Sequence, residues 1–336
     1  MGLMLGSSCP LLNGFILESG ALKSLGIKSA FSYTFVILSF CVPTAANAFS
    51  QAFVFGDSLS DAGRFFIASR GIAPQPPYDQ RFSNGIVWVE YLQTFLGLTP
   101  TLQTNFAIAG ATTGNANTVD SRLPGIEQQV GGFLLTNPAV DSDALYIVFG
   151  GANDYLGNQP INVSDSVDNI GDYIIDLYNA GARNFLIPNL PDLGQLPATL
   201  STPNSSNLSL ITQSHNGLLA FTLSSLSQNL PSIEITSLDI FSLFADARNR
   251  PIKYRFTNTD KACLSTIQDG IPAQPIEVCP NPNEYLFWDS IHPTTRSHQL
   301  IGQLALKALG IPEPSSTWGL LGLGLIAAGL SLIKKR

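Results

Sequence analysis

Two short motifs near opposite ends of the chain together contain the side chains of an activated hydroxyl nucleophile. FGDSLSD, at residues 55–61, includes Ser58, and DSIHP, at residues 289–293, includes Asp289 and His292. A serine hydroxyl attacks a carbonyl poorly at neutral pH unless a base takes its proton, and the base needs a partner that orients it. Because the chain has only three histidines, few residues could be that base.

Each motif taken alone also has an ordinary structural interpretation. Ser58 follows the strand-like run 51–55, and Gly56 permits a sharp turn that places Ser58 at the strand's carboxyl end, where open α/β sheets bind ligands. A Gly-Asp-Ser turn is also common in proteins of every kind. The three-residue spacing of Asp289 and His292 allows a carboxylate–imidazole contact, but the same pattern occurs in polar turns before helices. The residues alone leave both interpretations open.

Four motifs in order resemble those of the GDSL lipase/esterase family, also called SGNH hydrolases. They are FGDSLSDAG at 55–63, NFAIAGA at 105–111, GGAND at 150–154 and DSIHP at 289–293. The resemblance extends over about residues 53–310. It implies that Ser58 is the nucleophile, His292 the general base and Asp289 the residue that orients the base.

The resemblance also implies an oxyanion hole formed by the backbone N–H groups of Ser58 and Gly110 and the side-chain amide of Asn153. Acyl transfer builds negative charge on the carbonyl oxygen, and each fixed donor aimed at that oxygen contributes about 3–4 kcal/mol. Gly110 has no side chain to hinder approach to its N–H. Asn153 follows the strand-like run 144–149. Without the resemblance, the two residues would be interpreted as a tight turn and an Asx turn.

The other acids and histidines near these motifs are expected to have structural roles. Asp57, Asp61 and Asp154 are expected to bond local backbone N–H groups and hold their own loops. His215 lies in a helical stretch rich in Ser, Thr and Leu, and is expected to be structural. His298 is expected on the surface of a helix that begins near residue 294.

The predicted activity is hydrolysis of carboxylic esters, of a lipid or an acylated carbohydrate, by an exported serine esterase or lipase. The same residues could instead transfer the acyl group to a sugar or lipid alcohol, or the chain could be a non-catalytic surface or matrix protein on a hydrolase fold. No Cys/His cluster has the spacing of a zinc site, so no metal and no cofactor is expected. Net charge is −7 with a pI near 4.9, which gives no basic surface for nucleic acid.

Residues 1–48 are predicted to be a secretory signal peptide. Two lysines precede the apolar stretch 30–42, and Ala46-Asn47-Ala48 has the small-x-small pattern of a cleavage site. The segment is long for a signal peptide, so the true start codon could lie downstream of Met1. An uncleaved membrane anchor is the alternative, although the apolar stretch is short for a membrane span.

Residues 311–336 are predicted to be a sorting tail with a transmembrane helix. Pro312-Glu313-Pro314 precedes the apolar stretch 318–333, and the chain closes with Lys334-Lys335-Arg336. That stretch is near the lower length limit for a membrane helix, and the positive cluster favours the cytoplasmic side. The tail resembles the PEP-CTERM sorting signal, which implies processing by an exosortase-type enzyme; a plain membrane anchor is the alternative. Both predict export across the inner membrane to the periplasm, cell surface or medium, with at least transient anchoring.

Two of the four cysteines, Cys9 and Cys41, fall in the predicted signal peptide. The other two, Cys263 and Cys279, could form a disulfide in an oxidising compartment. Such a short closed loop would stabilise the fold by about 3 kcal/mol in the chain-entropy model. Two unpaired thiols are the alternative.

Residues 49–310 between the two signals are predicted to form one α/β hydrolase domain. Strand-like apolar runs recur at 51–55, 104–108, 144–149, 183–188 and 232–237. Helical patterns lie between several of them, notably around 167–178 and 208–229, and this alternation predicts a parallel sheet covered on both faces. The resemblance implies a flavodoxin-like, three-layer α/β/α fold with a central, mainly parallel five-stranded sheet.

Two long loops are candidates for the walls of a substrate pocket. The segment 64–85 closely follows the nucleophile motif and contains three prolines, and the segment 188–203 is rich in proline and leucine. Long loops in compact domains are often functional. The first loop could help to form the acyl pocket, or could be a surface loop with no contact to substrate, and the second could border the same cleft.

Overall fold

The computed structural model describes residues 49–157, 162–268 and 271–312. These residues belong to one compact unit, Ala45–Arg336. The predicted signal peptide and almost all of the predicted sorting tail lie outside the described residues. Within the described ranges, no helix combines the length and the apolar character that crossing a membrane requires.

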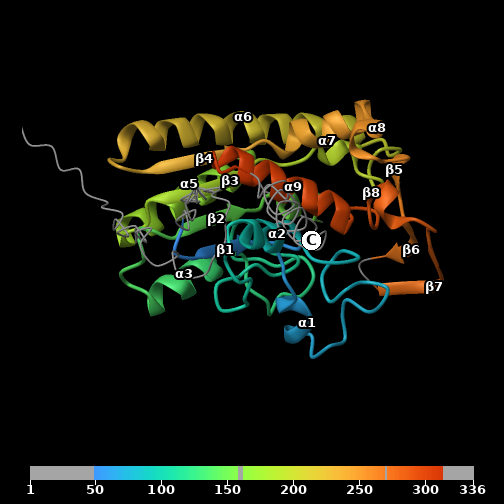
Figure 1. The fold of residues 1–336 in the computed structure, drawn as a ribbon, viewed down its shortest axis with the longest axis horizontal. Helices are drawn as coiled ribbons and strands as arrows, with labels where there is room; N and C mark the ends of the chain where they lie inside the picture. Colours follow the sequence, from blue (N-terminus) through green and yellow to red (C-terminus); the bar gives the residue numbers. More distant parts are fainter. Residues whose placement is uncertain (1–48, 158–161, 269–270, 313–336) are drawn as a thin grey trace, which may run out of the picture. The chain divides into compact units, whose positions relative to one another are not determined.

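A parallel sheet of four strands lies at the centre of this unit (Figure 1). The strands are, in spatial order, β1 (Ala52–Gly56), β2 (Leu145–Phe149), β3 (Asn184–Pro188) and β4 (Glu234–Leu238). All five residues of β2 are buried, as expected for an inner strand of a parallel sheet covered on both faces. The predicted three-layer α/β fold class is therefore confirmed.

The prediction of a fifth regular strand at 104–108 is wrong. This segment runs beside β1 and bonds to it through its backbone, but it forms only one parallel bridge, between Val54 and Asn105. The ladder ends there because the N–H of Gly56 donates to the side-chain oxygen of Gln129 at 2.9 Å and not to this segment. The carbonyl oxygen of Asn105 accepts from the guanidinium of Arg64 at 2.9 Å instead of from a strand. The segment still occupies the fifth position, which gives the flavodoxin-like order 2-1-3-4-5.

In this order β1 has β2 on one side and the segment 104–108 on the other. The strand order therefore reverses at β1, which creates a switch point at the carboxyl ends of β1 and β2. Open α/β sheets bind ligands at such a point. Ser58 lies just after β1, and Asn153 lies in α4 (Ala152–Leu156), just after β2. Two of the predicted site residues are thus placed by the topology of the sheet.

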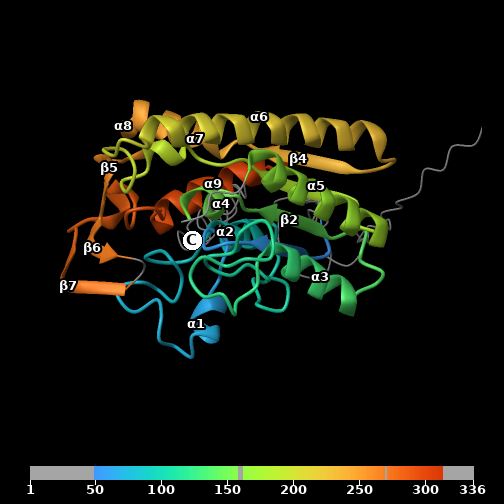
Figure 2. The ribbon, with the colours of Figure 1, turned by 180° about the vertical axis from the view of Figure 1, so that it is seen from behind.

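Helices cover both faces of the sheet (Figure 2). One face packs against α2 (Trp88–Phe95) and α9 (Thr295–Ala308), and the other against α3 (Ile126–Thr136) and α5 (Val163–Ala180). Leu145 and Ile147 point into the first core and Tyr146 and Val148 into the second, because successive strand residues alternate between faces. The long helix α6 (Ser205–Asn229) packs against α5 and β4.

Shorter elements complete the described part of the chain. They are α1 (Arg64–Ala68), η1 (Leu193–Gln195), α7 (Ile240–Asn249), α8 (Pro251–Tyr254), β5 (Asn258–Ala262), β6 (Leu264–Gln268), β7 (Ile271–Val278), η2 (Pro282–Glu284) and β8 (Tyr285–Phe287).

A disulfide joins Cys263 to Cys279 beside the chain segment that leads to Asp289. The N–H of Cys263 donates to the carbonyl oxygen of Phe287 at 3.1 Å, and that of Leu264 donates to Trp288 at 2.7 Å. The cross-linked segment is therefore fastened to the residues immediately before Asp289.

Candidate active site

The turn after β1 presents Ser58 at the end of the strand. The carboxylate of Asp57 accepts from the N–H of Leu59 at 3.0 Å, and the side-chain amide of Gln129 bonds both the N–H and the carbonyl of Gly56 at 2.9 Å. A Cβ atom at Gly56 would lie 2.5 Å from the carbonyl oxygen of Phe149. Only glycine lets β1 approach β2 this closely at the point where the turn begins.

The structure brings Ser58, His292 and Asp289 together in one chain of hydrogen bonds. His292 Nε2 lies 2.9 Å from Ser58 Oγ, and His292 Nδ1 lies 2.7 Å from Asp289 Oδ2. Asp289 Oδ1 accepts from the backbone N–H groups of Ile291 and His292, at 2.9 and 2.7 Å. All three side chains are at least nine-tenths buried, so water competes little for these hydrogen bonds.

The carboxyl group of Asp289 remains ionised in spite of its burial. Burial alone would raise its pKa, but the charge of His292 and the hydrogen bonds from His292, Ile291 and Tyr78 together bring the pKa below its ordinary value. A charged carboxylate against Nδ1 favours a proton on that nitrogen, which leaves Nε2 free to accept one from Ser58.

The backbone N–H groups of Ser58 and Gly110 donate to no protein acceptor within the described part of the chain. Gly110 has φ +81°, and a Cβ atom there would lie 2.4 Å from Asn117 Oδ1, so the position requires glycine. The preceding residue, Ala109, donates its N–H to Asp61 at 2.9 Å. This bond ties the Gly110 segment to the nucleophile turn.

The side-chain amide of Asn153 lines the same cavity as Ser58 and His292. One of its N–H groups donates to the carbonyl oxygen of Ala111 at 2.9 Å. This bond fixes the orientation of the amide and leaves its second N–H for another acceptor.

Asp57 and Asp61 bond backbone N–H groups of their own turn as expected, whereas Asp154 holds a different loop, 41 positions away along the chain. Asp61 accepts from the backbone N–H groups of the first residues of α1, and Asp154 accepts from the N–H of Thr113 at 2.9 Å. Burial raises the pKa of Asp57 to about 7, against the opposing effects of the N–H of Leu59 and the charge of His292.

Comparison with known proteins identifies the family. A family model described as GDSL-like lipase/acylhydrolase matches residues 53–305. The chain belongs to this family. It is accordingly a carboxylic ester hydrolase by class. A second model, the PEP-CTERM protein-sorting motif, matches residues 310–336, which confirms the resemblance of the tail.

Individual relatives differ in their described activities. The chain is 30% identical to the phosphatidylcholine-sterol acyltransferase of Aeromonas hydrophila, over 77% of this chain and 89% of that protein. It is 32% identical to the inactive GDSL esterase/lipase-like protein 25 of Arabidopsis thaliana, over 83% and 76%. A solved structure of a lipolytic G-D-S-L family protein from Veillonella parvula is 16% identical, covers 76% of this chain and 96% of its own, and has a TM-score of 0.44.

An apolar cavity of about 30 Å³ lies beside Ser58 and His292. Its apolar walls come mainly from α4, from the loop after β3 and from α7, through side chains that include Leu156, Leu193 and Ile240. The loop 188–203 therefore borders the cleft as expected. The loop 64–85 contributes no residue to this cavity, contrary to its expected role in an acyl pocket.

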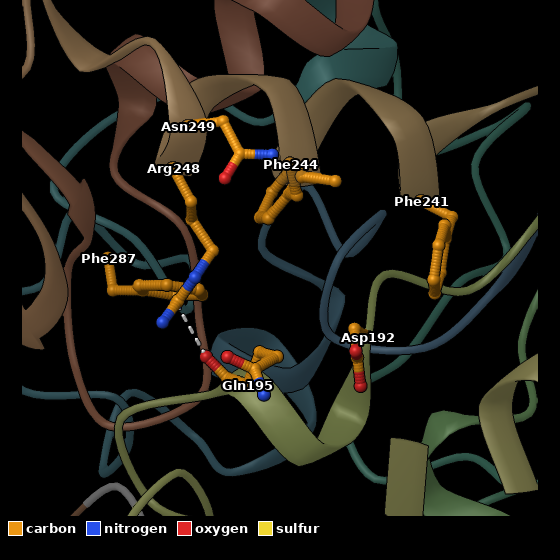
Figure 3. A pocket seen from close by; sticks show the side chains of 8 residues that line it. Asp192, Gln195, Phe241, Phe244, Arg248, Asn249 and Phe287 are labelled. Atoms are coloured by element: carbon orange, nitrogen blue, oxygen red, sulfur yellow. Dashed lines mark hydrogen bonds between the residues drawn. The ribbon is translucent and has the colours of Figure 1, made fainter. Parts of the chain in front are cut away.

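A larger hollow of about 170 Å³ shares the rings of Phe244 and Phe287 with this cavity but contains neither Ser58 nor His292 (Figure 3). Arg248 lines it and is held by protein partners: it donates to the carbonyl oxygen of Gln195 at 2.8 Å and pairs with Asp260 at 2.8 Å. Among the residues that the structure describes, no group of three or more His, Cys, Asp or Glu side chains could hold a metal ion.

The expectation that His298 lies on a helix surface is wrong. His298 is fully buried where α9 packs against α2, and its Nδ1 accepts from the N–H of Trp88 at 3.3 Å. Burial lowers its pKa to about 3. His215 is also buried, and its Nδ1 lies 2.8 Å from the hydroxyl of Tyr155. Neither ring lies in the hydrogen-bond chain of Ser58.

Two contacts of the site were not anticipated from the sequence. The hydroxyl of Tyr78 donates to Asp289 Oδ2 at 2.7 Å, and the ring of Phe82 lies 5.1 Å from that of His292. Both residues belong to the loop that was expected to contact substrate. The aromatic residues of this proline-containing loop could have indicated a packed loop. Their partners are about 210 positions away along the chain, so the sequence did not indicate which residues they contact.

Proposed function

We propose that this protein hydrolyses carboxylic esters through an acyl-enzyme on Ser58. The observation that carries the proposal is the continuous hydrogen-bond chain from Ser58 Oγ through the imidazole of His292 to Asp289, with distances of 2.9 and 2.7 Å. Family membership gives the reaction class, and the hydrogen-bond geometry supports the role proposed for each of the three residues.

In the first half of the reaction, His292 Nε2 takes the proton of Ser58 as Oγ bonds to the ester carbonyl carbon. The carbonyl oxygen becomes an oxyanion, which would accept from the N–H groups of Ser58 and Gly110 and from the amide of Asn153. The tetrahedral intermediate collapses, the C–O bond to the alcohol breaks, and His292 returns its proton to the leaving oxygen. Asp289 stabilises the imidazolium that exists between these steps.

In the second half, water loses a proton to His292 and attacks the acyl carbon. Collapse of this second intermediate releases the carboxylic acid and gives the proton back to Ser58. The apolar walls of the cavity beside Ser58 suit the acyl group of the ester.

Acyl transfer is the second candidate, since the Aeromonas relative is an acyltransferase. An alcohol in place of water would give a new ester from the same acyl-enzyme. We expect p-nitrophenyl butyrate to yield mainly butyric acid, even with glycerol or glucose present at molar concentration. Product analysis by mass spectrometry measures this, and a majority of new ester would favour transfer instead.

The inactive plant relative makes a non-catalytic protein the remaining alternative. The occupied nucleophile, base and orienting positions of this chain argue against it.

The PEP-CTERM motif supports export and processing of the tail by an exosortase-type enzyme. We accordingly propose a mature hydrolase of residues 49–310, separated from an N-terminal signal peptide and a C-terminal sorting tail that anchors it at least transiently.

Asn153→Ala is expected to lower kcat for p-nitrophenyl butyrate by about 100- to 1,000-fold, with KM changed by less than about threefold. The amide would act only on the oxyanion, which exists in the transition state and not in the bound ester. Initial-rate kinetics measure both constants. Asn169→Ala is the matched control, because this amide bonds Thr113 near the same loop and does not line the cavity. An unchanged kcat in Asn153→Ala would remove Asn153 from the oxyanion hole.

A further inference from the structure

Tyr78 contacts Asp289, the proposed orienting partner of His292, although the two residues are 211 positions apart in the sequence. Its hydroxyl donates to Asp289 Oδ2 at 2.7 Å, and the same oxygen lies 2.7 Å from His292 Nδ1. The two donors share one carboxylate oxygen. The hydrogen bond from the phenol reduces the negative charge on Oδ2, and this weakens the attraction between Oδ2 and the imidazole.

We propose that Tyr78 is a positioning residue for the Asp289–His292 pair: its hydroxyl fixes Oδ2 against the imidazole and moderates the negative charge that this oxygen presents. This inference rests on the proposed function, in which His292 is the base. It gives the loop between α1 and α2 a role in setting the pH range of the reaction instead of in contacting substrate.

The ring of Tyr78 is held on several sides. It is 4% exposed and lies 6.0 Å from the rings of Phe82 and Trp288, edge-on to both. Trp288 is the residue immediately before Asp289, and Cys263 of the disulfide belongs to the same buried cluster. The phenol and the carboxylate are therefore seated on one packed unit, and their contact does not depend on a mobile surface side chain.

The loop that carries Tyr78 is also fastened on the far side of His292. The hydroxyl of Ser83 donates to the carbonyl oxygen of Pro293 at 3.0 Å, and the side-chain oxygen of Asn84 accepts from the N–H of Thr295 at 2.8 Å. These bonds fix the loop to the residues that follow the histidine, while Tyr78 fixes it to Asp289 on the other side.

The hydroxyl of Tyr78 stays protonated, and so remains a hydrogen-bond donor to Asp289, at every pH of an assay. Burial, and then the charge of Asp289, raise the pKa of Tyr78 far above its ordinary value, so the phenol keeps its proton throughout an assay range. Asp57 and His298 also act electrostatically on His292; the pKa of Asp57 is raised to about 7, and that of His298 is lowered to about 3 by burial. Both groups are retained when only the Tyr78 hydroxyl is removed, so they cancel in a comparison of variants.

The test compares Tyr78→Phe with Tyr91→Phe in the purified full chain. Tyr91→Phe is the matched control, because Tyr91 lies in α2, where its hydroxyl lies 3.0 Å from Thr295 Oγ1 at the start of α9 and does not contact Asp289. In Tyr78→Phe, Oδ2 carries more negative charge and favours the imidazolium. The acid limb of kcat/KM against pH should move up by about half to one pH unit, as expected for loss of one hydrogen bond to a charged group, and the plateau should fall about 5- to 20-fold. Tyr91→Phe should keep the acid limb of the wild-type protein, and its plateau value of kcat/KM should fall less than twofold.

A second measurement, by NMR, detects the effect of the Tyr78–Asp289 hydrogen bond on His292 and needs no substrate. The low-field proton resonance of His292 Nδ1–H should shift in Tyr78→Phe and stay in place in Tyr91→Phe, whether or not the protein hydrolyses an ester. An unmoved resonance overturns the proposal for Tyr78 even in an active enzyme. A lower plateau with an unmoved acid limb also overturns it, because that is the result of a merely structural tyrosine. A wild-type protein with no esterase activity overturns the proposed function separately, and the resonance then still decides whether Tyr78 acts on the pair.

Discussion

Ser58→Ala is expected to lower kcat for p-nitrophenyl butyrate hydrolysis by about six orders of magnitude, as in other hydrolases that lose their serine nucleophile. Without Oγ there is no acyl-enzyme, and only the oxyanion donors and substrate binding remain to accelerate attack by water. Because Ser58 is small and its hydroxyl bonds only to His292 in the described structure, the midpoint of thermal unfolding should change little.

Ser290→Ala is the control for this experiment. Ser290 lies beside Asp289 in the second motif, and its hydroxyl takes no part in the hydrogen-bond chain from Ser58 to Asp289. It should retain activity within about threefold. A Ser58→Ala protein that keeps a tenth or more of the wild-type kcat would show that another group carries the acyl chain.

Asp289→Asn is expected to lower kcat by about four orders of magnitude. The amide cannot stabilise the imidazolium, and an amide N–H facing Nδ1 of His292 would place the imidazole proton on Nε2, where it cannot accept from Ser58. The variant should fold, because the backbone N–H groups of Ile291 and His292 can still donate to the amide oxygen at the Oδ1 position. The hydroxyl of Tyr78 can accept from the amide N–H at the Oδ2 position.

Initial rates across pH 5–9 measure the effect of Asp289→Asn, with Asp79→Asn as the matched control. Asp79 is an exposed carboxylate next to Tyr78 in the sequence, so this change removes an acid from the same loop without touching the pair. A loss of less than about tenfold in Asp289→Asn would contradict the role of Asp289 as the partner of His292.

The regular parts of the fold were predictable from local patterns. The apolar run 144–149 became the buried inner strand β2, and the apolar spacing at 167–178 became the face of α5 that packs on the sheet. Strands of a doubly covered sheet are apolar over their whole length, so composition alone indicates them. The segment 104–108 is also a strand-like apolar run, but the side chain of Gln129 takes the N–H of Gly56 that would have continued its ladder with β1. Gln129 is 73 positions from Gly56 along the chain, so the local pattern could not show this competition.

The three side chains of the hydrogen-bond chain could be singled out from the sequence because their motifs are short and the proposed chemistry restricts the residue types. The surroundings of those side chains were not predictable. His298 was expected to be exposed from its place in a polar-looking helix, yet α2 covers it completely. Tyr78 and Asp289 are 211 positions apart, and no periodicity relates them. Contacts of this kind follow from how loops pack, which depends on the whole fold.

The most direct test of the account is covalent labelling of the purified full chain with a fluorophosphonate, followed by peptide mass spectrometry. We expect one adduct on Ser58, no adduct in Ser58→Ala, and much slower labelling in Asp289→Asn, because the probe reacts only with an activated serine. Labelling at a different residue, or equal labelling of the wild-type and Ser58→Ala proteins, would contradict the claim that Ser58 is the nucleophile of this hydrolase.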